Sequence, residues 1–176
     1  MKALVDELVE YAVVLRDADT LAIEVFSLRE LFDELAVSCR TTIEAKGLQF
    51  ETFFDERLAV VSSNRLKLKQ IALNLLTNAS KYTKTGQIGL TMAADGKDHW
   101  QLRVSDTGVG IGQHDRERVF EEFERIAGDE VPGVGLGLAI VKEVCRMLGG
   151  EIHFDSREGL GTTFAIRFPM VLEPRN

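Results

Sequence analysis

Two glycine clusters, both within residues 104–140, constrain this chain more than any other feature. The first spans residues 106–110 (DTGVG) and the second residues 133–137 (GVGLG). Glycine loses more backbone entropy on folding than any other residue, so such clusters favour backbone that turns sharply or that lies close to a ligand. For each cluster alone, a purely structural turn is the alternative, because neither has the P-loop or the dinucleotide-binding spacing.

The residues around the clusters predict a strand before the first and a helix after the second. Residues 100–105 (WQLRVS) alternate and lead to Asp106, whose carboxylate can accept two hydrogen bonds, for example from an amino group on a base. After Gly137, apolar residues recur at helical spacing as far as Leu148. Glycines before a helix free its first amides, which can bind phosphate. One cluster therefore suits a base and the other a polyphosphate.

A third segment adds groups that suit a metal-bound nucleotide. Residues 74–83 (NLLTNASKYT) lie on a long apolar-periodic segment, where Asn74, Asn78 and Lys81 share one face of the predicted helix. Asn lowers helix propensity, so two of them among Leu and Ala indicate a specific use. An amide oxygen suits Mg²⁺ and a lysine suits a phosphate oxygen. The alternative is an Asn pair that hydrogen-bonds to a neighbouring loop.

Together these segments resemble the ATP-binding catalytic domain of sensor histidine kinases, part of the GHKL superfamily. Residues 74–78 look like its N box, 106–110 its G1 box, 120–123 its F box and 133–137 its G2 box. The order is that of the family, and the resemblance covers about residues 22–170. Strands interleaved with long helices predict an α/β sandwich. The resemblance further implies the Bergerat fold, a two-layer sandwich whose mixed, mostly antiparallel sheet carries three main helices on one face.

The resemblance also implies which residues bind ATP. Asp106 would accept the adenine amino group, and Gly108 and Gly110 would let the backbone pass close to the base. Tyr82 would stack near adenine; otherwise it is an amphipathic residue at a helix end. The other residues of the expected nucleotide site are Ile111, Phe120, Gly133, Gly135, Leu136, Gly137, Leu138 and Thr163.

Phosphate and Mg²⁺ would be held mainly by the predicted helix with the Asn pair. Asn78 would bind Mg²⁺ through its amide oxygen, Lys81 would contact phosphate, and Asn74 would support either. Arg125 would reach the γ-phosphate from a short lid over about residues 124–132, with a solvated arginine as the alternative. Phe120 and Phe123 fit lid anchors better than chemical groups.

One position bears directly on the reaction. ATP-hydrolysing relatives, such as gyrase-type topoisomerases and heat-shock chaperones, carry a Glu four residues before the Mg²⁺-binding Asn, as the general base for water. Here that position is Asn74, whose amide is not basic. We therefore expect ATP to be held intact for transfer to a protein side chain.

No phosphoacceptor histidine is recognisable in the sequence. His99 and His153 fall on predicted strands, and His114 lies beside the predicted lid. We therefore expect the acceptor on an upstream segment or another chain. The chain alone should bind nucleotide without fast autophosphorylation or hydrolysis.

The N-terminal residues carry an apolar heptad pattern. A helix packed on its own domain would explain it, but the resemblance implies that residues 1–20 are the tail of a dimerisation helix and a linker. Residues 21–176 would then form the ATP-binding catalytic domain. The seam of the pattern consists of Leu4, Leu8, Tyr11 and Leu15.

Composition and local signals complete the prediction. A formal net charge of −7 argues against non-specific nucleic-acid binding. No apolar run approaches the length of about 18 residues that a membrane helix needs, so we expect a cytoplasmic domain that meets a membrane only through upstream segments. Cys39 and Cys145 should be buried thiols.

Two helix starts can be predicted from capping residues. Ser27 and Glu30 form a capping box for a helix that runs to about Lys46. Residues 58–61 read as a strand, after which Ser62 or Ser63 would cap the helix with the Asn pair.

Three functions stay open at this point. The first is a histidine kinase catalytic domain of two-component signalling. Its partners would be a dimerisation or histidine phosphotransfer domain and the receiver domain of a response regulator, and its full-length form would be a homodimer. The second is a superfamily kinase that phosphorylates serine on a regulatory partner. The third is a non-catalytic nucleotide-binding module. The dimerisation-type heptad argues against the second, and the complete set of Asn78, Lys81 and Asp106 against the third.

Overall fold

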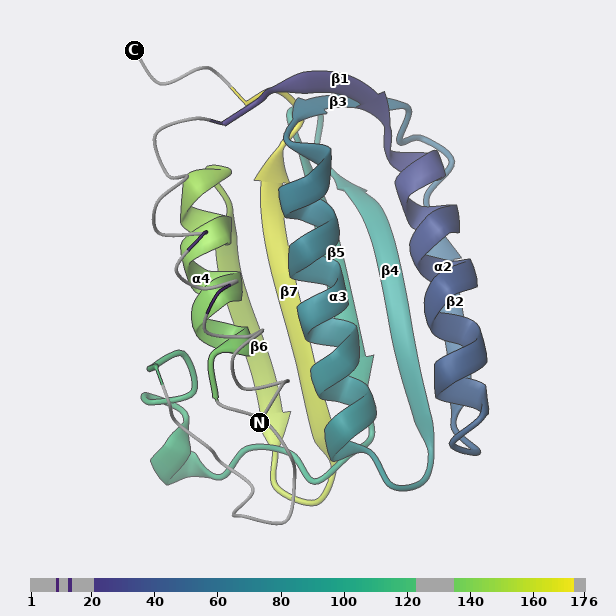
Figure 1. Cartoon of the computed structure of the whole chain (residues 1–176), viewed down its shortest axis with the longest axis vertical. Coiled ribbons are helices and arrows are strands. Elements are labelled where there is room, and N and C mark those ends of the chain that lie inside the picture. The colour runs from purple at the N-terminus through teal and green to yellow at the C-terminus, as the bar shows by residue number, and fades with distance from the viewer. Residues whose placement is uncertain (1–8, 10–12, 14–20, 123–134, 173–176) are drawn as a thin grey trace.

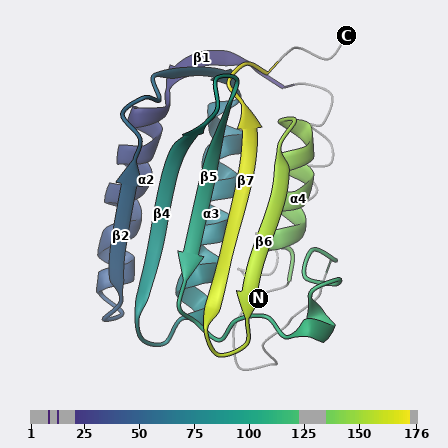
Figure 2. The ribbon, with the colours of Figure 1, turned by 180° about the vertical axis from the view of Figure 1, so that it is seen from behind.

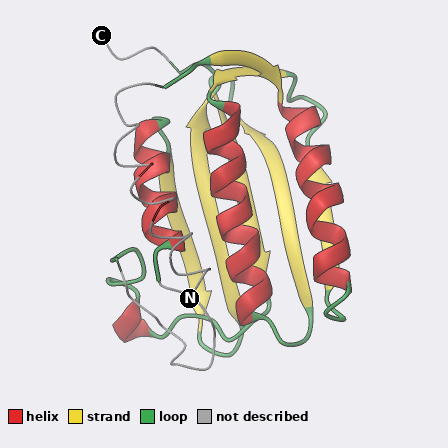
Figure 3. Ribbon diagram, in the orientation of Figure 1, coloured by secondary structure: helices red, strands yellow, loops and turns green. Residues whose placement is uncertain are grey.

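The structure is a computed structural model that describes residues 9, 13, 21–122 and 135–172. In this part of the chain, helices and sheet form two layers (Figures 1 and 3). One face of the sheet carries α2 (Leu28–Glu44), α3 (Arg65–Tyr82) and α4 (Gly137–Met147). Seen from behind, none of the described elements covers the other face (Figure 2).

The main sheet is mixed and mostly antiparallel, as predicted. Its strand order is β2-β4-β5-β7-β6, and only the β2–β4 pair is parallel. The strands are β2 (Gln49–Phe54), β4 (Gln87–Asp95), β5 (His99–Asp106), β6 (Glu151–Arg157) and β7 (Gly161–Pro169).

A small second sheet at one end of the domain corrects two predictions. It pairs β1 (Glu24–Ser27) with β3 (Val60–Ser63), so the third strand begins and ends two residues later than expected. Ser62 and Ser63 are therefore strand residues, and neither caps α3. The cap is Asn64, whose Oδ1 accepts a hydrogen bond from the amide of Lys67 at 2.9 Å.

The first described helix starts as predicted. The Ser27 hydroxyl accepts a hydrogen bond from the amide of Glu30 at 3.3 Å, which confirms the helix start at the capping box. The helix ends at Glu44, slightly before the predicted Lys46. Gly47 follows with a φ of 76°, a conformation that suits glycine and turns the chain into β2.

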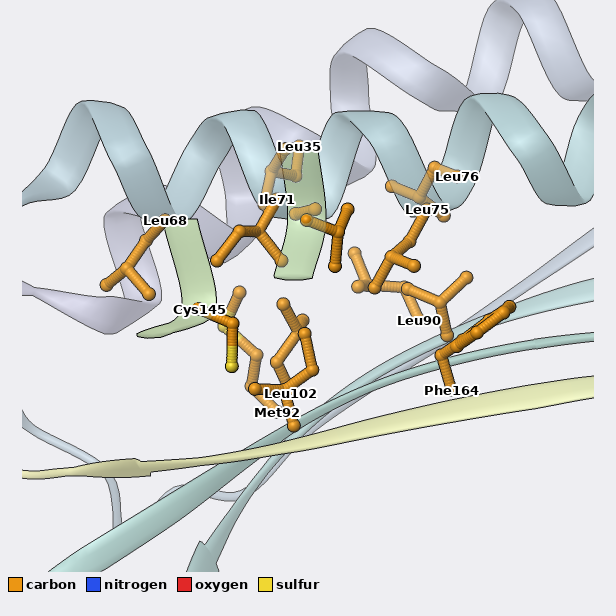
Figure 4. Close-up of a cluster of buried hydrophobic side chains, with 14 of the residues drawn as sticks. Leu35, Leu68, Ile71, Leu75, Leu76, Leu90, Met92, Leu102, Cys145 and Phe164 are labelled. Carbon is orange, nitrogen blue, oxygen red and sulfur yellow. The ribbon is translucent and has the colours of Figure 1, made fainter. Parts of the chain in front are cut away.

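The core lies between the sheet and the helices (Figure 4). Leu90 and Leu102 on the inner face of the sheet meet Leu75 on α3 and Cys145 on α4, all at most 1% exposed. Burying each such aliphatic side chain contributes about 1.5–3 kcal/mol. This packing fixes α3 beside α4, so residues from both helices meet at one end of the domain.

No helix among the described residues is long and apolar enough to span a membrane. Burial raises the pKa of the Cys145 thiol to about 12, in line with its prediction as a buried thiol, whereas Cys39 is only partly buried. The heptad seam and linker lie outside the described residues, as do Phe123, Arg125 and Gly133 with the rest of the expected lid.

Candidate functional site

Four segments meet at the lower end of the domain in Figure 1. They are the end of α3, the loop after β5, the turn between β6 and β7, and the start of α4. This end carries the predicted N box, the G1 box and the described part of the G2 box.

Asp106 is the last residue of β5, and its carboxylate is held in a defined orientation. Its Oδ1 accepts hydrogen bonds from the amides of Gly108 at 2.9 Å and Thr162 at 3.3 Å. Among the described residues Oδ2 has no hydrogen-bond partner. Burial raises the pKa of this carboxyl group, while the two amide hydrogen bonds oppose the rise. One carboxylate oxygen is thus fixed, and the other can accept a hydrogen bond from a ligand.

The loop after Asp106 lies directly on the end of α3. The amide of Val109 donates to the carbonyl oxygen of Tyr82 at 3.1 Å. A Cβ at Gly108 would collide with that same carbonyl group. Gly110, with a φ of 68°, would likewise place a Cβ against the carbonyl oxygen of Arg157. These two glycines therefore permit backbone to approach backbone, and the expected approach to a base stays a prediction.

The Asn pair faces the start of α4. A Cβ at Gly137 would lie 3.2 Å from Oδ1 of Asn74, and 3.5 Å and 3.6 Å from Nδ2 and Oδ1 of Asn78. The Nδ2 of Asn74 donates to the carbonyl oxygen of Gln70 at 3.1 Å, which leaves its Oδ1 directed at α4. The two predicted boxes are therefore in direct contact.

The start of α4 offers backbone amides. Leu136 occupies the N-cap position without a side-chain capping hydrogen bond. Gly135 before it has a φ of 81°. Because the first amides of a helix have no intrahelical acceptor, those of Gly137 and Leu138 can meet an anion. The described residues contain no cluster of His, Cys, Asp and Glu suited to a metal, so a metal here would depend on amide and phosphate oxygens. Mg²⁺ prefers such oxygen ligands, which fits Asn78.

Of the other residues predicted for the nucleotide site, some are partly exposed and others are packed in the core. Lys81 and Tyr82 are half-buried on the last turn of α3. Ile111 and Leu136 are buried in the core. Phe120 packs edge-on against two rings of the sheet, Phe154 at 5.8 Å and Phe164 at 6.1 Å between ring centroids.

Thr163 was predicted for the nucleotide site, but its neighbour Thr162 is the residue that lies opposite Asp106. Thr162 pairs with Asp106 across the strands and donates its amide to that carboxylate. Thr163 pairs with Ser105, so its side chain points to the opposite face of the sheet. Ser156 on β6, which was not predicted for the site either, is buried and hydrogen-bonded to Thr162. Strand alternation around Phe164 could have favoured Thr162, whereas no sequence signal distinguishes Ser156.

Comparison with known families shows to which family the chain belongs. A family model described as "Histidine kinase-, DNA gyrase B-, and HSP90-like ATPase" matches residues 63–172. The chain belongs to this ATPase family. The matched segment contains every described residue of the site.

Curated relatives of this ATPase domain are sensor kinases. This chain is 38% identical over 154 residues to the histidine protein kinase DivJ of Caulobacter vibrioides. The aligned region covers 85% of this chain and 26% of DivJ. The chain is 36% identical over 149 residues to the sensor histidine kinase RcsC of Escherichia coli, covering 82% of this chain and 16% of RcsC. The chain thus spans about a quarter or less of the length of these two relatives.

Solved structures of the same kind share the fold of this ATPase domain. Full-length ShkA in complex with AMPPNP aligns with a TM-score of 0.83 and 28% identity, over 97% of this chain and 36% of that chain. The catalytic domain of the histidine kinase ThkA aligns with a TM-score of 0.73 and 27% identity, over 88% and 99% respectively. The predicted membership of the GHKL superfamily and the predicted fold are both confirmed.

Proposed function

We propose that the domain binds Mg-ATP and donates its γ-phosphate to a histidine of a dimerisation or phosphotransfer domain in two-component signalling. The carboxylate of Asp106 is the observation that carries this proposal. Its Oδ1 is held by two amides and its Oδ2 has no hydrogen-bond partner among the described residues. Oδ2 would accept the amino group of adenine. Guanine presents a carbonyl oxygen there, which a buried carboxylate repels, so the site discriminates against GTP.

The contact between α3 and α4 supports a polyphosphate beside the base. Asn78 would bind Mg²⁺ through Oδ1, and the amides of Gly137 and Leu138 would receive phosphate oxygens. Lys81, half-buried one turn beyond Asn78, would contact phosphate. When bound, the ion neutralises charge on the phosphates. Tyr82 would stack near adenine; Arg125 and Gly133 keep the roles expected for them, outside the described residues.

Transfer to a protein is favoured over hydrolysis by Asn74. Its amide has no basic lone pair for activating water, and its Nδ2 is already bonded to the carbonyl oxygen of Gln70. We therefore assign Asn74 to supporting Mg²⁺ or phosphate. The γ-phosphoryl group would leave ADP for the imidazole nitrogen of the acceptor histidine.

The greater length of the curated relatives supports the proposed partners. DivJ and RcsC are kinases much longer than this chain, and the name of LuxQ of Vibrio cholerae describes both kinase and phosphatase. We propose that residues 1–20 are the tail of a dimerisation helix with its linker, and that residues 21–176 form the catalytic domain. The full-length protein would be a homodimer that serves a receiver domain.

The test is phosphoryl transfer to a supplied acceptor. The chain is incubated with γ-labelled ATP and Mg²⁺, alone and with a separate helical hairpin that carries an acceptor histidine. Acid-labile label on the hairpin, with little label on the chain alone, is the expected result. The efficiency should be low because untethered partners lose their high effective concentration.

Other outcomes identify the alternative functions. Acid-stable label would indicate transfer to serine. Nucleotide binding without transfer would indicate a non-catalytic module. Fast phosphate release would contradict the role given to Asn74, and fast labelling of His99, His114 or His153 would show that an acceptor is present in this chain.

A further inference from the structure

Ser156 has a buried hydroxyl group that joins two segments of the nucleotide site. It lies near the end of β6 and is 2% exposed. Its Oγ accepts a hydrogen bond from the amide of Ile111 at 2.8 Å. It donates to the carbonyl oxygen of Gly161 at 3.0 Å and lies 2.8 Å from Oγ1 of Thr162.

The direction of each hydrogen bond follows from the single proton of the hydroxyl group. The carbonyl oxygen of Gly161 can only accept, so it takes the proton of Ser156. Thr162 must then donate its own hydroxyl proton to Ser156. One donated and two accepted hydrogen bonds use the full capacity of the Ser156 hydroxyl.

The two amides that hold Asp106 belong to the two segments that Ser156 joins. Gly108 donates to Asp106 from the loop that continues to Ile111, whose amide is bonded to Ser156. Thr162 donates its amide to the same carboxylate oxygen, and its hydroxyl group is bonded to Ser156. The Ser156 hydroxyl group is thus bonded to both segments whose amides hold the Asp106 carboxylate. In each segment, the residue bonded to Ser156 is at most three positions from the amide donor or is the donor itself.

The fit between the two segments is close at other points as well. The amide of Gly159 donates to the carbonyl oxygen of Val109 at 2.7 Å. A Cβ at Gly161 would collide with the carbonyl group of Asp106. The guanidinium of Arg116 donates to the carbonyl oxygen of Ser156 itself. Because segments that are packed and hydrogen-bonded in this way shift together, loss of the Ser156 hydroxyl group should change the position of the Asp106 carboxylate as well as the mobility of the loop.

We infer that Ser156 is a positioning residue that sets the orientation of the Asp106 carboxylate and thereby the preference for adenine. This inference rests on the proposed function, because it takes Asp106 as the group that recognises the base. Ser156 touches the carboxylate only through Gly108 and Thr162 and their neighbours. Loss of the Ser156 hydroxyl group should therefore change the selectivity for the base and the protection of the Gly108 and Thr162 amides from hydrogen exchange.

The test compares Ser156→Ala with a matched control. Ser63→Ala removes another buried serine hydroxyl, from β3 at the opposite end of the domain. Each variant is first checked by thermal unfolding, and its dissociation constants for ATP and GTP are then measured with Mg²⁺ present. Hydrogen exchange of the Gly108 and Thr162 amides is followed without nucleotide.

The proposal predicts that Ser156→Ala lowers the ratio of GTP to ATP dissociation constants by about tenfold and speeds exchange at both amides. Ser63→Ala should leave the ratio and the two exchange rates unchanged. An Ser156→Ala protein that keeps the parent's ratio and protection would overturn the proposal, even if its melting temperature is lower. If Ser156→Ala does not fold, Thr162→Val decides in the same way, because it removes the hydroxyl donor and keeps the amide.

The role of Asp106 and the role of Ser156 can be tested separately. A parent protein with equal affinity for ATP and GTP would contradict the assignment of Asp106 to adenine, and with it the effect on selectivity. A parent that prefers ATP, beside an Ser156→Ala variant with the same preference, would contradict only the role of Ser156.

Discussion

The side-chain amide of Asn78 lies against the first residue of α4, with Nδ2 3.5 Å and Oδ1 3.6 Å from the position of a Cβ at Gly137. These residues are far apart in the sequence and come from different motifs. Their contact exists because α3 and α4 pack side by side on the same sheet. An amide oxygen is thus placed next to the open amides of a helix start, where a phosphate and its metal ion would lie.

Asn78→Ala should abolish phosphotransfer and weaken Mg²⁺-dependent nucleotide binding while the fold survives. Asn64→Ala in the same helix is the matched control, because Asn64 caps α3 at its other end. It should lower the free energy of unfolding by about 1 kcal/mol and leave nucleotide affinity unchanged. Circular dichroism and calorimetry measure the two effects. An unfolded Asn78→Ala protein would show that this amide supports the core instead.

Gly108→Ala should damage the site through the backbone. Its Cβ would collide with the carbonyl group of Tyr82, so the loop would have to leave the end of α3. We expect nucleotide affinity to fall at least tenfold and the melting temperature to drop. Gly112→Ala in the same loop is the control, since its Cβ would have no neighbour closer than 3.6 Å. Equal affinities for the two variants would contradict the importance of this contact.

Stability and nucleotide affinity should both depend on pH through the carboxyl group of Asp106. Burial raises its pKa above the ordinary value of 3.8 in the folded protein. The folded state therefore holds the proton of Asp106 more tightly than the unfolded chain does. As the pH rises from 3.8 through the raised pKa of the folded state, this carboxyl group contributes less and less to the free energy of unfolding. A bound adenine amino group stabilises the charged form, so nucleotide should lower this pKa and affinity should rise with pH over the same window.

Carbon-detected NMR of the Asp106 carboxyl group, titrated with and without ADP, measures both effects. Asp106→Asn serves as the control for the titration of the nucleotide itself. A carboxyl pKa that ADP does not change would mean that the base is held elsewhere.

Lys46 should stabilise the end of α3 that contacts the loop of Gly108. Its Nζ donates to the carbonyl oxygen of Ser80 at 3.1 Å and to its hydroxyl group at 2.8 Å. Lys46→Met should lower the free energy of unfolding by about 1–2 kcal/mol, because a buried hydroxyl and a helix-end carbonyl lose their partner. Lys97→Met, at an exposed turn, should have no measurable effect. Urea denaturation compares the two, and equal stabilities would show that the Lys46 contacts contribute nothing.

Local sequence signals predicted the parts of the fold that depend on neighbouring residues. The capping box at Ser27, the strand that leads to Asp106 and the helix after the second glycine cluster all form as expected. Ser62 and Ser63 looked like caps because serine is a good capping residue. Strand β3 uses them in pairing with β1, a contact with a distant segment that no local pattern reveals.

The sequence marks the residues of the candidate site that belong to motifs, but it does not mark those that only tertiary contacts bring there. Asp106 and the Asn pair stand out because a strand end and a helix interior make those residue types unusual. Ser156 is an ordinary strand serine until folding brings it to Ile111, 45 residues away. The choice between Thr162 and Thr163 depends on which of them faces Asp106, and the register of β5 and β7 decides that.

Calorimetric titration of the parent and of Asp106→Asn with ATP and GTP, in the presence of Mg²⁺, tests the central claim most directly. The account predicts that the parent binds ATP and binds GTP only weakly. Asp106→Asn should lose about 2 kcal/mol of this preference, a factor of about 30 in the ratio of dissociation constants. Equal affinity of the parent for ATP and GTP would contradict the assignment of Asp106 as the residue that recognises adenine.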